Sequence, residues 1–337
     1  MSVNKNPKVS IIILNYNGMP FVDKCFHSIR EQTYKNIETI FFDNDSPDES
    51  VEYTRKNWPG IQVTHSKINH FFAKGNNEAA KLATGDYFFF LNNDTYLHPQ
   101  CIEKLVEAIA EGVGTYAPKM MDYEGKQMIE LGMGVDKYAF PWQKISEKIF
   151  YVEGSGLFIQ KELWQKLGGF DEAMVNVVED LDLCWRLQLL GYRIKKVPEA
   201  IFYHYGGATL GGTNTVTDKK KNNYTTNLNK RYHGERNQLR TLLKNYSMGT
   251  LLIILIQYYF WKVLEVGFLL LKGRFRFVWR GYIQAHWWNI TQLPDTLRKR
   301  RKIQKMRTVS DQAIEQNMTP GNAKLHMFRL IGTPKIK

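Results

Sequence analysis

The chain has 337 residues, 43% of them hydrophobic and 23% charged, which fits one large globular domain with an appendage and excludes a disordered or collagen-like chain. Its three cysteines lie far apart without a C-x-x-C pair, which excludes a disulfide-stapled miniprotein, argues against a zinc knuckle and fits a reducing cytosol. The net charge of +13 is unevenly divided, because residues 1–211 hold 22 Lys and Arg against 27 Asp and Glu, whereas residues 212–337 hold 24 against 6.

Short apolar runs alternate with helix-like stretches at the start of the chain. We expect strands at Val9 to Leu14, Ile37 to Phe42, Ile61 to Val63 and Tyr87 to Leu91, with helices over 21–32, 49–57 and 73–84. The runs recur about every 26 residues, which is the length of a βα unit. Because they are apolar throughout, they predict a doubly wound, mostly parallel α/β sheet that is buried on both faces. The first run is too short for the core of a signal peptide, so we expect a cytoplasmic protein.

Polar residues directly follow three of these strands. They are Asn15-Tyr16-Asn17-Gly18, Asp43-Asn44-Asp45-Ser46 and Asn92-Asn93-Asp94-Thr95. Since ligands bind outside the carboxyl ends of the strands in such sheets, these segments predict a ligand site at one edge. The chain has no G-x-G-x-x-G after its first strand and no G-x-x-x-x-G-K-[ST], which argues against a dinucleotide oxidoreductase and a P-loop phosphotransferase.

Asp94 is a candidate ligand for a divalent cation. It follows a very apolar strand, and Mg²⁺ or Mn²⁺ takes one or two carboxylates and completes its shell with substrate phosphates. The residues alone also allow Asp94 to cap the following helix or turn, a role that is compatible with metal binding.

Acidic residues open a helix that we expect from Glu179 to Gly191, after short strands at Val113 to Ala117 and Tyr151 to Ile159 and a turn at 168–172. A helix start held near the sheet edge would present one of the carboxylates of Glu179, Asp180 and Asp182 as a general base for a hydroxyl nucleophile. A purely structural role explains the same pattern, because acidic side chains in a first turn complement the helix dipole.

His204 ends the strand-like stretch Ala200 to Tyr203 and precedes two glycines, which predicts a position at a sheet edge. An imidazole there suits Mn²⁺, although a lone histidine fits a simple hydrogen-bonded role equally well.

Seven segments in a fixed order resemble glycosyltransferase family 2, and within it the rhamnosyltransferase-like branch. They are residues 9–18, 43–48, 75–77, 91–95, 154–156, 168–172 and 179–184. Together they are much more specific than any single motif, and the resemblance extends over residues 7–240. The family has the GT-A fold, which agrees with the expected sheet.

The resemblance implies transfer of a sugar from a nucleotide diphosphate sugar to an acceptor hydroxyl, with inversion and with Mn²⁺ or Mg²⁺ as cofactor. Asp94 and His204 would hold the metal, and Asp180 would be the base, with Glu179 and Asp182 beside it. The residues that would bind the donor are Asn15, Tyr16, Asp43, Asn44, Asn77, Asn92, Asn93 and Arg236. An Asp at the base suits UDP and dTDP donors alike, including dTDP-rhamnose, since uracil and thymine present the same N–H edge.

Two positions depart from the family pattern. Phe71 and Asp45 stand where relatives usually have glycine, so we expect a reshaped donor pocket. The Q-x-x-R-W element and the several membrane helices of processive members are missing as well, which favours single additions to a glycan or lipid-linked acceptor in surface polysaccharide synthesis over polymer synthesis.

The basic second part of the chain needs an anionic partner. Residues 249–271 are strongly apolar, but Lys262 and Glu265 make a membrane span costly. Basic residues mixed with Trp and Tyr predict an anchor on an anionic membrane surface at its cytoplasmic face, with burial of 249–271 as the alternative. Nucleic acid is disfavoured, because no nucleic-acid-binding fold accompanies the charge. We expect a catalytic domain over 1–240, a helical basic extension over 241–337, and a tail-like character for the last 66 residues.

Two rival functions remain at this point. A nucleotidyltransferase shares the fold but needs a glycine-rich first loop with Arg or Lys, which the sequence lacks. A degenerate sugar-binding or scaffold protein would have no need to keep both Asp94 and Asp180.

Overall fold

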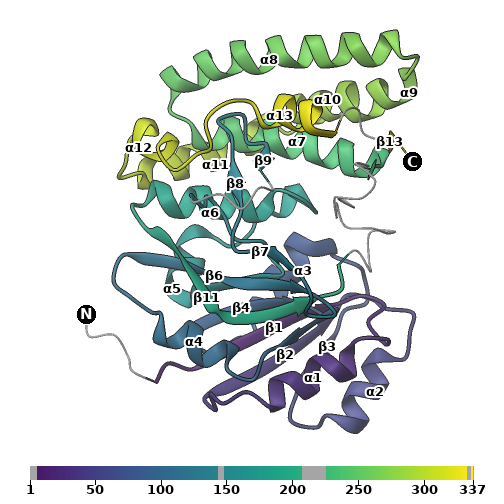
Figure 1. Ribbon diagram of the computed structural model, residues 1–337, viewed down its shortest axis with the longest axis vertical. Coiled ribbons are helices and arrows are strands. Elements are labelled where there is room, and N and C mark those ends of the chain that lie inside the picture. The colour runs from purple at the N-terminus through teal and green to yellow at the C-terminus, as the bar shows by residue number, and fades with distance from the viewer. Residues whose placement is uncertain (1–5, 143–147, 207–224, 332–334, 337) are drawn as a thin grey trace.

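A nine-stranded mixed sheet forms the lower half of the molecule as drawn in Figure 1. The computed structural model describes residues 6–142, 148–206, 225–331 and 335–336. The strand order is β3-β2-β1-β4-β10-β6-β11-β5, and β7 pairs with β6. Helices cover the sheet, and a helical layer lies above it (Figure 1).

The first four strands of the sheet are parallel and confirm the expected βα units. They are β1 (Val9–Asn15), β2 (Ile37–Asp43), β3 (Gln62–His65) and β4 (Tyr87–Asn92), separated by α1 (Val22–Arg30), α2 (Ser50–Asn57) and α3 (Phe71–Ala80). Asn15 pairs in register with Asp43, and Leu14 with Asn92. The polar segments after the strands therefore meet at one edge, as the sequence predicts.

The rest of the sheet mixes strand directions. After β5 (Thr95–Leu97) come α4 (Cys101–Glu107), β6 (Val113–Asp122), β7 (Met128–Glu130), the hairpin strands β8 (Gly134–Val135) and β9 (Pro141–Trp142), β10 (Gly156–Gln160), α5 (Lys161–Leu167), the 3₁₀ turn η1 (Glu172–Met174), α6 (Glu179–Leu189) and β11 (Arg193–His204). The strand β10 runs antiparallel to both of its neighbours, β4 and β6, and β5 runs antiparallel to β11. Because β10 begins only at Gly156, it is shorter than the expected strand from Tyr151, and Glu153, Gly154 and Ser155 line a cavity instead.

Each face of the sheet has its own hydrophobic core, and alternation along β1 divides the two. Ile11 and Ile13 pack toward α1 and α4, whereas Ile12 packs toward α3, α5 and α6. This second core continues upward into the C-terminal helices through residues such as Leu242 and Ile254. A strand that is apolar at every position thus buries both of its faces.

The C-terminal region is folded into helices, so the expectation of a tail over the last 66 residues is wrong. The elements are α7 (Leu228–Asn245), α8 (Met248–Leu271), α9 (Phe275–Val278), the π-helical turn η2 (Trp279–Gln284), α10 (Ala285–Thr291), α11 (Leu293–Met306), α12 (Asp311–Glu315) and α13 (Ala323–Ile331), with β12 (Thr225–Thr226) paired to β13 (Lys335–Ile336). Ile303, Ile314 and Met318 join the core beside α6 and α7, which supplies the apolar contacts that hold these basic helices. The helix α7 runs across the expected boundary at residue 240.

Candidate active site

A cavity of about 1400 Å³ lies between the carboxyl edge of the sheet and the C-terminal helices. Among the residues expected in the site, those that line it are Tyr16, Asn44, Asn92, Asn93, Glu179, Asp180 and His204. Asn15, Asp43, Asn77, Asp94, Asp182 and Arg236 do not line it. The two groups differ in what their side chains contact.

A buried network of polar side chains holds the ends of β1, β2 and β4 together. The Asn15 amide donates to Asp43 at 2.6 Å and accepts from Asn93 Nδ2 at 2.7 Å. The second Asp43 oxygen accepts from the backbone N–H of Ser46 at 3.0 Å and lies 2.8 Å from His65 Nδ1. Asn15 and Asp43 are fully buried, so these contacts give them a structural role beneath the cavity floor.

Gly18 lies directly against this network. A Cβ at residue 18 would collide with Asn15 Oδ1, and it would lie 2.5 Å from Asn93 Nδ2. The glycine of the Asn15-Tyr16-Asn17-Gly18 segment is therefore needed because the backbone approaches two amide side chains closely.

Asn44 shapes the loop that precedes α3. Its Oδ1 accepts from the backbone N–H of His70 at 2.7 Å, and its Nδ2 donates to Asn69 Oδ1 at 2.9 Å. Asn44 and Asn69 both line the cavity, so this pair fixes part of its wall.

Phe71 and Asp45 both adopt left-handed backbone conformations, with φ of 59° and 66°. Such conformations favour glycine and cost a residue with a Cβ about 1–2 kcal/mol. The geometry explains why glycine is usual at these two positions, and the Phe71 side chain now lines the cavity with 55% of its surface exposed.

Asp94 and His204 form a buried pair at the end of the sheet. Asp94 Oδ1 lies 3.2 Å from His204 Nε2, and Asn92 Nδ2 lies 3.4 Å from the same nitrogen. Burial alone would lower the pKa of His204, but the hydrogen bond and the charge of Asp94 outweigh burial and raise that pKa. The described part of the chain contains no cluster of three or more His, Cys, Asp and Glu side chains that could hold a metal by itself.

Asp180 lies in the first turn of α6 and lines the same cavity as His204. Its carboxylate accepts from the backbone N–H groups of Gly154 at 3.1 Å and Leu181 at 2.7 Å. Burial and the charge of Glu153 raise the pKa of Asp180 to about 7, which suits a group that must take up a proton near neutral pH. Burial and the charge of Asp180 likewise raise the pKa of Glu179, whose Oε2 has no hydrogen-bond partner among the described residues.

Asp182 points away from the cavity into a cluster of ion pairs. It contacts Arg186 at 2.9 Å and Lys244 at 2.8 Å, and its side chain is fully buried. Burial would raise the pKa of Asp182, but the charges of Lys244 and Arg186 outweigh it and lower that pKa. Its position supports a structural role in fastening α6 to α7.

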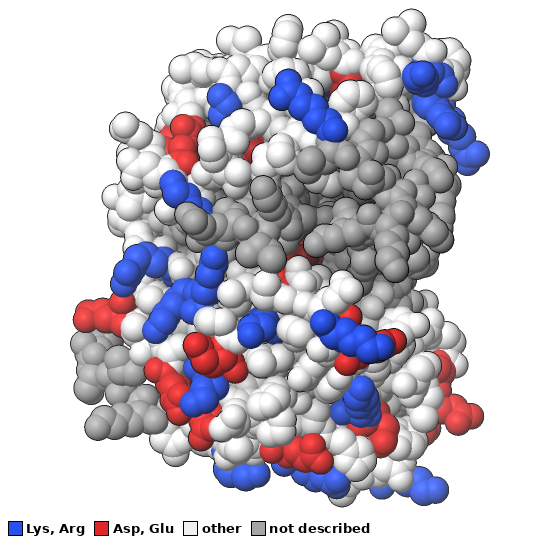
Figure 2. All heavy atoms as spheres, in the orientation of Figure 1, with Lys and Arg blue, Asp and Glu red and all other residues white. Residues whose placement is uncertain are grey.

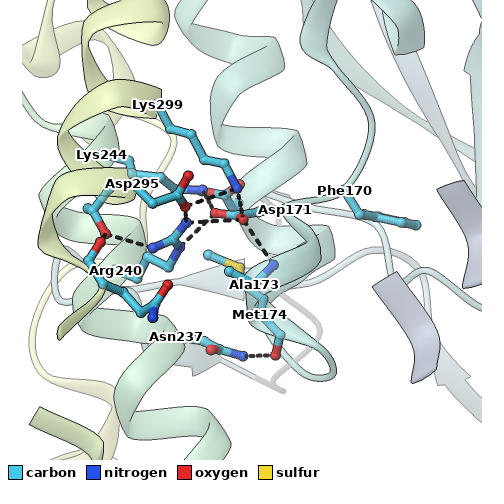
Figure 3. Close-up of polar contacts among 12 residues, drawn as sticks. Phe170, Asp171, Ala173, Met174, Asn237, Arg240, Lys244, Asp295 and Lys299 are labelled. Atoms are coloured by element: carbon cyan, nitrogen blue, oxygen red, sulfur yellow. Dashed lines mark hydrogen bonds and ion pairs between the residues drawn. The ribbon is translucent and has the colours of Figure 1, made fainter. Parts of the chain in front are cut away.

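The Asp171 carboxylate lies at the centre of the neighbouring cluster (Figure 3). It contacts Arg240 at 2.8 Å, Lys244 at 2.6 Å and Lys299 at 2.5 Å, and Asp295 contacts Arg240 from the other side. Burial would raise the pKa of Asp171, yet the charges of Lys244 and Arg240 outweigh it and hold that pKa well below its usual range. The cluster ties the 168–172 turn to α7 and α11.

Arg236 and Asn237 hold the loop between η1 and α6. The Arg236 guanidinium donates to the carbonyl of Met174 at 2.9 Å and stacks 4.4 Å from the Trp288 ring. Asn237 Nδ2 donates to the carbonyls of Met174, Asn176 and Val177 at 2.9, 2.9 and 2.7 Å. Figure 3 shows Asn237 beneath the Asp171 cluster, with its amide directed at Met174. Arg236 thus lies outside the cavity and supports one of its walls.

Asn77 fastens α3 to the same turn. It donates to the carbonyl of Phe170 at 3.0 Å and accepts from the Phe170 backbone N–H at 2.9 Å. These two reciprocal hydrogen bonds explain why residue 77 is an Asn, without any contact to a nucleotide-sugar donor.

Sequence reasoning missed Glu153 and the basic residues of the upper cavity. Glu153 lines the cavity beside Asp180, and burial, together with the charge of Glu153 and a hydrogen bond to it, raises the pKa of Glu130. The basic lining residues come from α7, the end of α8, the turn after it, and α13: Lys230, Arg231, Lys262, Lys272, Arg274 and Lys324. The sequence did offer a signal for Glu153, because this residue directly precedes the Gly154-Ser155-Gly156 motif. The basic residues could not be placed in the cavity, because the sequence does not show that the C-terminal helices close over the sheet.

Comparison with known proteins gives a family match and several relatives. Residues 10–165 match the model of Glycosyl transferase family 2. An uncharacterized glycosyltransferase of Haemophilus influenzae is 26% identical over 223 residues, which is 63% of this chain and 74% of that protein. The amylovoran biosynthesis glycosyltransferase AmsB of Erwinia amylovora is 25% identical over 214 residues, which is 59% of this chain and 70% of AmsB.

The fold also has a match among solved structures. The mannosyltransferase PcManGT of Pyrobaculum calidifontis, in complex with GDP-Man and Mn²⁺, superposes with a TM-score of 0.52 at 16% identity. The match covers 72% of this chain and 66% of PcManGT. The sheet and its covering helices therefore have the GT-A architecture.

Proposed function

We propose that this glycosyltransferase, whose residues 10–165 match family 2, is an inverting, metal-dependent enzyme that moves a sugar from a nucleotide diphosphate sugar to an acceptor hydroxyl. The observation that carries the proposal is that His204, paired with Asp94, and the Asp180 carboxylate face one cavity at the sheet edge. AmsB, a relative in polysaccharide biosynthesis, supports a glycan or lipid-linked acceptor in surface polysaccharide synthesis.

Asp94 and His204 fit a divalent cation. An ion with ligand bonds of about 2.1 Å places adjacent ligands about 3 Å apart, close to the separation of their side chains. One carboxylate and one imidazole leave the other positions to the donor diphosphate, and the Mn²⁺ of PcManGT supports this use. When bound, the cation neutralises the charge that develops on the departing diphosphate.

Asp180 supplies the base. Two backbone N–H groups orient its carboxylate, and its carboxylate makes no ion pair with a cation among the described side chains, so it keeps the basicity that its raised pKa implies. In the proposed reaction Asp180 takes the proton of the acceptor hydroxyl while that oxygen attacks the anomeric carbon from the side opposite the diphosphate, which inverts the carbon.

The proposal for the donor nucleotide depends on which residues are available to contact its base. Both Asp43 oxygens are engaged by Asn15, Ser46 and His65, so base recognition through Asp43 requires that one of these contacts be exchanged for the nucleobase. Tyr16 and Asn44 are the sequence neighbours of Asn15 and Asp43, and they line the cavity, where a donor can contact them. UDP and dTDP donors, including dTDP-rhamnose, remain the proposal.

The protein is further proposed to work at the cytoplasmic face of a membrane, bound peripherally. The basic residues of 212–337 and the apolar helix α8 support this location.

A thermal-shift screen of the purified protein tests donor and metal together. UDP-, dTDP- and GDP-sugars are each added with Mn²⁺, with Mg²⁺ and with chelator. We expect one nucleotide class to raise the melting temperature only with a cation, because a ligand that binds the folded state stabilises it. Folded protein that no donor stabilises would contradict the proposal.

Asp180→Asn tests the base. We expect turnover to fall by at least about a thousandfold while donor binding and melting temperature change little, since the base acts on the acceptor. Asp182→Asn is the matched contrast, and it should lower the melting temperature because Lys244 and Arg186 lose a buried partner. Wild-type turnover in Asp180→Asn would show that another group is the base.

A further inference from the structure

The helix α8 has two chemically different sides. Its buried residues are Leu251, Ile254, Tyr258 and Lys262, which recur at helical spacing and face the rest of the protein. Its opposite side exposes Leu252, Ile253, Ile256, Phe260, Val263, Leu264 and Leu271, each by more than half of its surface. Figure 1 shows α8 as the outermost helix at the top of the molecule, with α10 and α13 beneath it.

A second set of exposed apolar side chains lies along α9 to α11. They are Phe275, Trp279, Ile283, Trp287, Ile290, Leu293 and Leu297, and they recur every three or four residues in the sequence, which we refer to as the stripe. We call the exposed apolar residues of α8 together with this stripe the apolar face. A soluble monomer rarely leaves so large a set of contiguous apolar side chains uncovered.

Basic side chains border the apolar face. The exposed ones are Lys272, Arg274, Arg276, Arg280, Arg298, Arg301, Lys302 and Lys305. Asp295 is the only acidic residue in the sequence between Lys272 and Ser310. Figure 2 shows an upper region that is mostly uncharged, with Lys and Arg at its right end and at scattered positions across it beside a few acidic side chains, whereas acidic and basic side chains mix densely over the sheet below. Apolar and aromatic side chains bordered by cations match the interface of an anionic bilayer.

The polar residues of α8 argue against a crossing of the membrane. By length and apolar composition α8 is the one helix in the described segments that would be able to span. However, Lys262 pairs with Glu235 of α7, and Glu265 pairs with Lys324 of α13 at 2.9 Å. A spanning α8 would have to break these pairs or draw α7 and α13 into the bilayer with it.

We propose that the apolar face is a docking surface for an anionic lipid bilayer, with α8 lying along the bilayer surface. The proposal deepens the membrane location inferred above and assigns its contact residues. Ile256 and Val263 enter the acyl boundary, the tryptophans lie at headgroup level, and the bordering Lys and Arg contact lipid phosphates.

Vesicle flotation tests the surface. We expect the wild-type protein to float with phosphatidylcholine vesicles that contain phosphatidylglycerol, to float less with phosphatidylcholine alone, and to dissociate as salt rises. Ile256→Glu with Val263→Glu should lower binding at least about tenfold, because the bilayer no longer buries two aliphatic side chains. The control Met128→Glu changes an exposed apolar residue of β7 and should bind as the wild type does.

The charge requirement is tested in the same assay. Arg276→Ala with Lys302→Ala should weaken binding to phosphatidylglycerol vesicles, whereas Lys56→Ala with Lys67→Ala, two exposed lysines of the sheet domain, should not. Equal binding of all variants would overturn the docking surface. A second result would also overturn it. If the wild-type protein forms a dimer and does not bind lipid, and the Ile256→Glu/Val263→Glu variant is a monomer, the apolar face belongs to a second copy of the chain instead.

Cysteine labelling tests the orientation of α8. Met248→Cys and Arg276→Cys place one exposed thiol near either end of α8, and the native Cys25, Cys101 and Cys184 are buried, with pKa values raised by that burial. A membrane-impermeant maleimide added outside sealed vesicles should label both ends of a helix that lies on the surface. Protection of one end would show that α8 crosses. Donor-induced thermal shifts of the same variants, measured without lipid, report separately on the transferase function.

Discussion

At the residue scale, Asp180 and Asp182 show what spacing alone leaves undecided. Successive residues on an α-helix are rotated by about 100°, so side chains that are two positions apart face nearly opposite directions. Asp180 faces the cavity and Asp182 faces Lys244, but the sequence does not reveal which side of α6 is turned to the sheet edge. The residue types were predictable, whereas their partners depend on helices that are distant in the sequence.

With Asp180 as the proposed base, its raised pKa predicts the pH dependence of the reaction. A base works only when deprotonated, so turnover should fall as the pH drops below about 7, by roughly tenfold per unit at low pH. The pH profile of kcat checks this. Glu153→Gln removes the neighbouring charge and should move the profile to lower pH, whereas Glu162→Gln on the exposed side of α5 should leave it in place. An unshifted profile in Glu153→Gln would contradict the assignment.

Asn237 is predicted to matter for catalysis although it lies outside the cavity. Val175, Val177 and Val178 all have positive φ, a strained state for valine that needs outside support. Asn237→Ala removes the contacts to this loop and should lower the free energy of unfolding by about 2 kcal/mol. Kinetics should show a lower kcat, because Glu179 and Asp180 follow the loop directly. Asn57→Ala, which loses one local hydrogen bond at the end of α2, is the control and should change neither quantity much.

At the element scale, α7, α8 and α13 are joined by an ionic cluster on the upper cavity wall. Glu235 of α7 contacts Lys262 of α8, Lys324 of α13 at 2.5 Å and Arg231 at 3.0 Å, and Glu265 contacts the same Lys324. Burial would raise the pKa of Glu235, but the charges of Lys262 and Lys324 outweigh it and hold that pKa well below its usual range. The charges interrupting the apolar run at 249–271 were visible in the sequence, and their partners were not.

Glu235→Gln should destabilise the protein by about 3–5 kcal/mol, since buried cations lose their main counter-charge. Chemical unfolding monitored by circular dichroism measures the change. Glu124→Gln removes an exposed carboxylate that pairs with Lys126 at the surface and should cost less than about 0.5 kcal/mol. Similar stabilities for the two variants would mean that the cluster contributes little.

At the scale of the whole molecule, the core on the α3, α5 and α6 face of the sheet continues into the C-terminal helices, and the buried ion pairs of Asp171 and Asp182 join the two parts. The first four strands and the polar edge were predictable, because parallel strands carry their own apolar signature and end in polar residues. The antiparallel direction of β10 was not predictable, since a short apolar run does not indicate in which direction a strand runs. The folding of residues 272–331 over the sheet was not predictable either, because basic helices resemble a tail until their contacts are known.

Removal of residues 241–337 should prevent the remaining chain from folding. The cut falls within α7 and removes Lys244 and Lys299, which leaves Asp171 and Asp182 buried without most of their counter-charges. We expect the intact chain to unfold in one transition, with coincident curves from tryptophan fluorescence and circular dichroism. A 1–240 fragment that unfolds cooperatively near the midpoint of the intact chain would establish residues 1–240 as an independent domain.

The helix α8 carries part of the apolar face and also borders the cavity, which Tyr258, Phe268 and Leu269 help to line. With α8 on a bilayer, an acceptor anchored in that bilayer reaches the enzyme by lateral diffusion, while the soluble donor arrives from the sheet side. The two substrates then approach by separate routes, and the enzyme can be recharged with donor without leaving the surface. Its rate should follow the density of acceptors per unit of membrane area, so adding acceptor-free lipid at constant acceptor number should slow the reaction.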